Sequence, residues 1–156
     1  MRKVILGIGN TLNHDEGLGV HALERIKLQL VERSEVEVID GGTLGLNLLQ
    51  LVEECSHLLI LDTIDAGKEP GTLIELKNEE IPLFRDVKMS EHQITFQEVL
   101  GLAKIRERLP DNLFLLGIQP AYTKVGVGLS EIIENKMPAL VDRAKEIIGN
   151  WKESKN

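Results

Sequence analysis

The stretch of sequence that decides the fold is Val4-Ile5-Leu6-Gly7-Ile8-Gly9-Asn10, followed by Thr11-Leu12-Asn13-His14 and Asp15-Glu16-Gly17-Leu18-Gly19-Val20. A short apolar run ends in glycines, a polar loop comes next, and two adjacent carboxylates stand where apolar residues begin to recur at helical spacing. This order predicts a strand, a loop and a helix. The loop combines acids with glycines, which is the composition of a segment that can hold a ligand.

The alternation of strands and helices continues along the chain. The pattern predicts strands at 3–8, 36–39, 57–61 and 113–118, and helices at about 17–32, 44–55, 95–108 and 130–148. Residues 72–76 form a further short strand that follows the third strand too closely for a helical crossover, so we expect it to pair antiparallel at an edge. We therefore predict an α/β fold, a three-layer sandwich with a mostly parallel sheet of about five strands and one short antiparallel edge strand.

Composition narrows the class of protein. The chain has 156 residues without repeats or low-complexity linkers, so we expect a single domain, 1–156. The formal net charge is −7 and no basic run occurs, which argues against a nucleic-acid partner. Cys55 is the only cysteine, so neither an internal disulfide nor a cysteine metal cluster can form, and we expect a cytoplasmic protein. No apolar run approaches the roughly 20 residues that span a bilayer, so we expect no membrane insertion.

Three potential metal ligands fall at one edge of the predicted sheet. Glu16 follows the first strand, Asp62 ends the third, and His92 opens a later helix. In parallel sheets ligands bind beyond the carboxyl ends of the strands, so we expect these residues to approach one another although they are far apart in sequence. Two carboxylates and one imidazole suit a divalent transition metal and leave positions open for water or for ligands from a partner.

These residues also have structural interpretations. Asp15 and Glu16 can be first-turn acids that complement a helix dipole, and Asp62 can be a loop-capping aspartate. The glycines on both sides of the acid pair favour a functional loop instead, because they let the backbone approach a ligand.

Four smaller expectations concern local structure. Asp40-Gly41-Gly42-Thr43 fits a strand-to-helix turn with Thr43 as N-cap. Ser90 and Gln93 have the spacing of a capping box. His14 borders the acid pair and can touch a ligand. Residues 151–156 are expected to form a frayed tail.

Two nucleotide-binding motifs and one hydrolase motif are absent or incomplete. Gly7-Ile8-Gly9 begins a dinucleotide fingerprint, but Leu12 stands where the third glycine belongs, and the acids of the loop would repel a pyrophosphate. No lysine follows a P-loop spacing, and no G-x-S-x-G elbow for a serine hydrolase occurs.

The chain resembles the hydrogenase maturation endopeptidases from residue 2 to about residue 148. The order and spacing of several motifs carry this resemblance: Gly7-Ile8-Gly9-Asn10, Asp15-Glu16-Gly17-Leu18-Gly19-Val20, Asp40-Gly41-Gly42-Thr43, Leu61-Asp62-Thr63-Ile64-Asp65-Ala66-Gly67 with Pro70-Gly71, and Ser90-Glu91-His92-Gln93. Proteins of that family trim the C-terminal extension from the nickel-loaded large subunit of [NiFe]-hydrogenases.

The resemblance implies a partner, a metal and a set of site residues. The partner is a [NiFe]-hydrogenase large-subunit precursor, and the metal is nickel, which we expect the substrate to supply; no organic cofactor is expected. The metal-contacting positions of the family fall on Glu16, Asp62 and His92. The match at Asp40, Gly41 and Gly42 implies a part in substrate recognition or in shaping the cleft.

Two mechanisms remain open at this point. The metal can act as a Lewis acid on the scissile carbonyl or on water, or nickel can be only a recognition tag while a carboxylate activates the water. Glu16 or Asp62 would be that catalytic base, with Asp15 a weaker candidate. Two other classes of protein also remain: a non-catalytic nickel-binding maturation chaperone that uses the same trio, and a Rossmann-type nucleotide-binding module.

Overall fold

The computed structural model describes residues 1–30, 35–42, 45–82 and 91–151, with only the backbone of 45–46 and 91–95. Its five strands are β1 (Arg2–Ile8), β2 (Glu37–Gly42), β3 (Cys55–Thr63), β4 (Leu73–Lys77) and β5 (Asn112–Ile118). They form one sheet in the order β2-β1-β3-β5-β4, in which β4 pairs antiparallel with β5 and all other pairs are parallel. The predicted α/β fold is confirmed, including the antiparallel strand at the edge.

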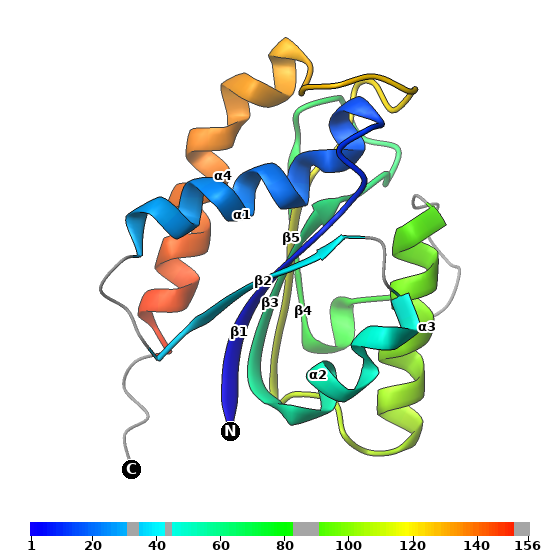
Figure 1. The fold of residues 1–156 in the computed structure, drawn as a ribbon, viewed down its shortest axis with the longest axis vertical. Helices are drawn as coiled ribbons and strands as arrows, with labels where there is room; N and C mark the ends of the chain where they lie inside the picture. Colours follow the sequence, from blue (N-terminus) through cyan, green and yellow to red (C-terminus); the bar gives the residue numbers. More distant parts are fainter. Residues whose placement is uncertain (31–34, 43–44, 83–90, 152–156) are drawn as a thin grey trace.

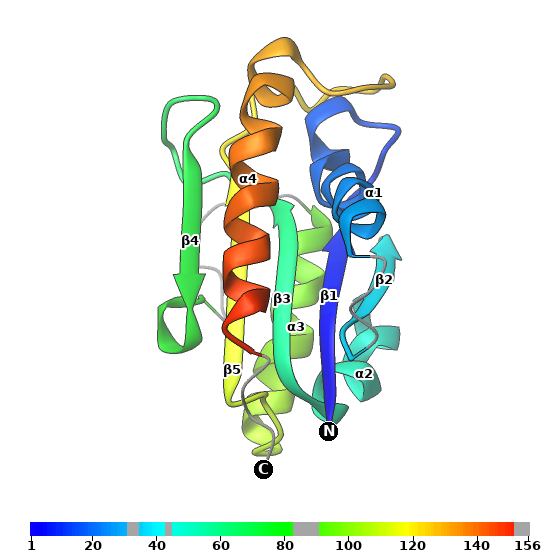
Figure 2. The same cartoon turned by 90° about the vertical axis from the view of Figure 1, so that its left-hand side faces the viewer.

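Helices cover both faces of this sheet. They are α1 (Leu18–Gln29), α2 (Leu49–Glu54), α3 (Glu91–Ile105) and α4 (Glu131–Gly149), with short 3-10 turns η1 (His14–Gly17), η2 (Gly45–Leu48) and η3 (Asn78–Glu80). Figures 1 and 2 show α1 and α4 on one face and α2 and α3 on the other. In the described ranges, no helix combines the length and the hydropathy that crossing a bilayer requires.

Alternation along the strands builds two hydrophobic cores. In β1, Val4, Leu6 and Ile8 pack in the core under α2 and α3, while Ile5 packs in the core under α1 and α4. Both sets are buried, because each face of a parallel sheet covered by helices must be apolar. The carboxyl ends of β1, β2 and β3 therefore emerge together at one edge, which we call the rim.

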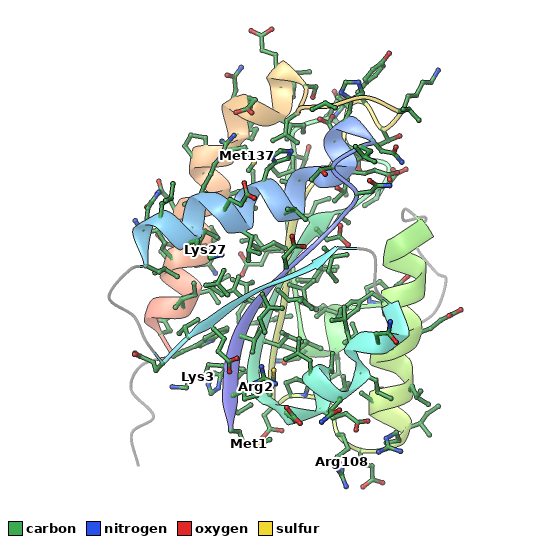
Figure 3. The ribbon with its side chains drawn as sticks, in the orientation of Figure 1. Met1, Arg2, Lys3, Lys27, Arg108 and Met137 are labelled. Carbon is green, nitrogen blue, oxygen red and sulfur yellow. The ribbon has the colours of Figure 1, made fainter. Side chains whose placement is uncertain are left out.

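Ion pairs connect β1 to β2 and α2 at the opposite end of the sheet. Arg2, at the start of β1, contacts Glu37 of β2 and Glu54 of α2, each at 2.7 Å. Figure 3 labels Arg2 and Lys3 at this end, beside the first residue of the chain. The Arg2 guanidinium holds the pKa of Glu37 below its usual value through a direct hydrogen bond. All of these charges lie at the end of the sheet away from the rim.

Several element boundaries differ from the sequence prediction. The first helix begins as the 3-10 turn η1, and β2 extends through Gly42, so Asp40-Gly41-Gly42 belongs to a strand rather than to a turn. Helix α3 begins at Glu91 rather than near residue 95. The expectation of a frayed tail is wrong for Trp151, which is 5 % exposed and packs in the core under α4. The predicted caps Thr43 and Ser90 lie outside the described residues.

A glycine allows α1 to cross the rim at close range. A Cβ added to Gly19 would lie 2.1 Å from the carbonyl oxygen of Leu61 and 2.3 Å from that of Ile8. Real Cβ atoms do not approach backbone that closely, so only glycine lets the helix rest on the ends of β1 and β3. Gly9 and Gly17, on the two sides of the acid pair, are also closely packed: a Cβ there would lie 2.2 Å from the Glu16 carbonyl oxygen and 2.7 Å from the Thr11 Cα. These contacts are within the protein, and the approach to a ligand stays a prediction.

Gly19→Ala is therefore expected to lower the free energy of unfolding by about 1–3 kcal/mol, because the helix must move away from two strand ends. Urea unfolding measures the change. Gly149→Ala is the matched control, since a Cβ at Gly149 in α4 meets nothing within 4 Å. An equal loss of stability in both variants would show that the close approach of α1 is unimportant.

Candidate active site

Glu16 lies on the rim in η1, between β1 and α1. Its backbone is fixed by the preceding loop: the Glu16 amide donates to the Asn13 carbonyl at 3.0 Å, and the Asn10 amide donates to the Glu16 carbonyl at 3.1 Å. The Asn13 side-chain amide lies 3.4 Å from Glu16 Oε1. Glu16 is partly exposed as a residue.

Asp62 is the penultimate residue of β3 and is 2 % exposed. Its Oδ1 accepts a 2.7 Å hydrogen bond from the amide of Thr63. It borders a small, mostly apolar cavity toward the α3 side of the sheet, whose other lining residues are Ile60, Ile81, Phe96, Gln97, Leu100 and Leu115. A carboxylate at the edge of such a cavity is poorly screened by water, so it interacts strongly with any cation or proton donor that enters.

One hydrogen bond joins the segments that carry the two acids. The hydroxyl of Thr63 donates to the backbone carbonyl of Asp15 at 2.8 Å. Thr63 follows Asp62 and Asp15 precedes Glu16, so this contact fixes η1 on the end of β3. The structure therefore brings together at the rim two acidic segments that are 46 positions apart, as the sequence predicted.

Position 92 lies in the first turn of α3, and this end of α3 points toward the rim in Figure 1. Phe96 and Gln97, about one turn further along the helix, line the cavity that Asp62 borders. The side chain of His92 is outside the described part of the structure. Among the side chains that are described, no three His, Cys, Asp or Glu residues gather as a metal site, so the trio with His92 stays a prediction.

The segment from Asp40 to Gly42 ends β2 beside the carboxyl end of β1. Gly7 pairs with Asp40, and the amide of Gly9 donates to the Gly42 carbonyl at 2.9 Å. Gly42 has a φ of +51°, and its amide donates to Asp40 Oδ1 at 2.9 Å. Asp40 is exposed, so its carboxylate remains accessible at the rim. This placement is compatible with the predicted part in substrate recognition.

From the sequence, Asp15 is a possible helix-dipole acid or a weaker candidate for the catalytic base. It is 0 % exposed, and its carboxylate accepts four hydrogen bonds: from the amides of Ala121, Tyr122 and Ser130 and from the Ser130 hydroxyl, at 2.7–2.9 Å. All three partners lie between β5 and α4. Asp15 therefore fastens the connection 119–130, which we call the β5–α4 loop, to η1. No local sequence signal marks this role, because the partners are more than 100 residues away.

His14 makes contacts with the same loop. Its φ is +47°, its Nδ1 lies 2.9 Å from the carbonyl oxygen of Gly128, and its ring is 5.1 Å from that of Tyr122. Gly126 packs so closely against the imidazole that any Cβ there would overlap it. The structure thus packs His14 against the β5–α4 loop, and the ligand contact that the sequence suggested stays a prediction.

Cys55 lies at the other end of the sheet, at the first residue of β3, and is 2 % exposed. Burial raises the pKa of its thiol to about 11, so the sulfur is protonated and unreactive at neutral pH. We expect iodoacetamide at pH 7.5 to alkylate the native protein at least about 100-fold more slowly than the urea-unfolded protein. Mass spectrometry measures the modification. Rapid alkylation of the native protein would contradict the assigned burial.

Comparisons with known proteins identify the family. Residues 20–147 match the hydrogenase maturation protease family. A hydrogenase expression/formation protein HupD from Rhizobium leguminosarum bv. viciae is 40% identical over 152 residues, which are 96% of this chain and 75% of the relative. The hydrogenase 2 maturation protease of Escherichia coli is 36% identical over 142 residues, covering 90% of this chain and 87% of the relative.

The fold agrees with a solved structure of that class. The hydrogenase maturating endopeptidase HybD from E. coli superposes with a TM-score of 0.87 at 30% identity, covering 97% of this chain and 94% of that one. This α/β sandwich therefore has the fold of a known endopeptidase. The chain belongs to the hydrogenase maturation protease family.

Proposed function

We propose that this protein removes the C-terminal extension of a nickel-loaded [NiFe]-hydrogenase large-subunit precursor, and that it senses the nickel through Glu16, Asp62 and His92. The observation that carries the proposal is the Thr63–Asp15 hydrogen bond, which holds the Glu16 and Asp62 segments together at one rim. Family membership supports the peptidase class and disfavours both the non-catalytic chaperone and the nucleotide-binding module.

The oxygen and nitrogen ligands of the rim suit a metal that is already bound by ligands of the precursor. Two carboxylates and an imidazole leave several coordination positions unfilled, and a metal carried by the precursor would keep its ligands there. An enzyme that checks for nickel must not hold a tight copy of its own, because a resident ion would satisfy the check without the substrate. The carefully chelated protein is accordingly expected to contain far less than one nickel per chain.

Peptide hydrolysis at this rim needs a base for the attacking water. Glu16 is partly exposed and can take a proton from a water next to the scissile carbonyl; Asp62, at the edge of the apolar cavity, is the second carboxylate within the same region. Water oxygen then bonds to the carbonyl carbon, the C–N bond breaks, and the proton passes to the leaving amine. Nickel held by the rim would fix the precursor so that its C-terminal segment crosses these carboxylates.

The test is cleavage of nickel-loaded against nickel-free precursor by the same chelated protein. Intact-mass spectrometry is expected to show loss of one C-terminal peptide from the loaded form and none from the nickel-free form. Equal cleavage of both forms would show that the protein does not sense nickel, although it would still show that the protein is a peptidase. Binding of loaded precursor without cleavage would support the chaperone instead.

A further inference from the structure

The β5–α4 loop exposes an apolar surface next to the rim. Val125 is 85% exposed and Val127 is 80% exposed, with Tyr122 at 52% and Leu12 of the first loop at 62%. We call these four residues the rim patch. Figures 1 and 2 both show the loop beside η1, at the end of the molecule where β1 and β3 finish.

Backbone hydrogen bonds beneath the rim patch hold its two loops in a fixed position. The Gly126 amide donates to the Leu12 carbonyl at 2.8 Å, and the His14 amide donates to the Gly126 carbonyl at 2.9 Å. These bonds join the two loops directly between Val125 and Val127. The four hydrogen bonds to the buried Asp15 carboxylate fasten the rest of the loop. The valines are therefore presented to the outside by a fixed backbone.

The composition of the β5–α4 loop also differs from that of the chain as a whole. The sequence has 25 acidic residues, but none lies between Asp111 and Glu131, and Lys124 is the only charged residue of the loop. A loop that has few charged residues and exposes aliphatic and aromatic side chains is typical of the centre of a protein interface. A connection with no partner would instead be expected to carry polar side chains.

We propose that the rim patch is the docking surface for an apolar stretch of the precursor polypeptide, next to the segment that is cleaved. The proposal rests on the proposed function, because a peptidase must hold its protein substrate across the catalytic rim. The patch is continuous with that rim through Asn13, whose backbone pairs with Gly126 and whose side chain contacts Glu16. A substrate that crosses Glu16 would therefore also pass the loop that carries Leu12 and the loop that carries the two valines.

The experiment compares Val125→Ser/Val127→Ser with the control Leu28→Ser/Ile105→Ser. Leu28 and Ile105 are 80% and 75% exposed, at the ends of α1 and α3 away from the rim, so the control removes similar aliphatic surface elsewhere. All proteins carry Glu16→Gln to prevent consumption of the precursor. Calorimetric titration with nickel-loaded precursor is expected to give a dissociation constant at least about tenfold higher for the patch variant and unchanged for the control.

The remaining outcomes each decide something. An unchanged dissociation constant in the patch variant overturns the docking surface, as does an equal rise in the control. Sedimentation that shows a dimer of the parent protein, dissociated by the patch substitutions, would assign the surface to a second copy instead. Binding through the patch without cleavage by the Glu16-bearing protein would remove the proposed function and keep the docking surface. Equal melting temperatures confirm that the variants are folded.

Discussion

Glu16→Gln is expected to lower the rate of precursor cleavage by at least about 100-fold, because an amide neither takes a proton from water nor offers a charged ligand to nickel. The substitution is nearly isosteric. It keeps an oxygen that can accept the contact from Asn13, so η1 should retain its position. The measurement is the single-turnover cleavage rate of nickel-loaded precursor, with the melting temperature recorded alongside.

Glu24→Gln provides the matched control for this variant. Glu24 is exposed on α1, two turns beyond η1, so the same glutamate-to-glutamine substitution is made there outside the rim. Its cleavage rate is expected to equal that of the parent protein. Undiminished processing by Glu16→Gln would remove Glu16 from the catalytic rim, whereas equal losses in both variants would point to a general effect of surface charge.

Asp15→Ala is expected to lower the free energy of unfolding by at least about 3 kcal/mol. The substitution removes the charged acceptor of the amides of Ala121, Tyr122 and Ser130, and a hydrogen bond to a charged group contributes about 1.5–3 kcal/mol. Because the whole stability of a domain is about 5–15 kcal/mol, this is a large fraction. For a chain of this length the melting temperature should fall by about 6–12 °C.

Asp142→Ala is the control for that loss, since Asp142 is exposed on α4 and its removal should change stability by no more than about 0.5 kcal/mol. Asp15→Asn separates geometry from charge: the amide keeps one acceptor oxygen but turns a donor toward other donors, so a smaller loss is expected. A variant Asp15→Ala as stable as the parent would contradict the role of Asp15 as the anchor of the β5–α4 loop.

The rim could be predicted from sequence because two rules act together there. Apolar runs such as Leu58 to Leu61 identify strands covered on both faces, and right-handed crossovers bring their carboxyl ends to one edge. An acid at the end of such a run, or in the loop that follows it, is then expected near that edge. Glu16 and Asp62 were placed by this reasoning alone, and the antiparallel edge strand followed from the short connection before it.

Long-range polar contacts could not be predicted in the same way. Asp15 and Glu16 are adjacent acids in the sequence, yet one is fully buried and the other partly exposed, because only Asp15 faces the amides of a loop more than 100 residues away. The role of Gly19 could not be predicted for a similar reason: its close approach is set by the carbonyl oxygens of Ile8 and Leu61, which are distant in the sequence. Trp151 was assigned to a tail because burial against α4 leaves no periodic signal in so short a segment.

The most direct test of the central claim is a crystal of this protein grown with millimolar nickel and measured at the nickel absorption edge. The account predicts one strong anomalous peak at the rim, bound jointly by the carboxylates of Glu16 and Asp62 and by the imidazole of His92. The peak should disappear after the crystal is washed in chelator, because the protein alone is expected to bind nickel weakly and the substrate is expected to supply the metal. A well-occupied peak held by other residues, with none between these three, would contradict the account.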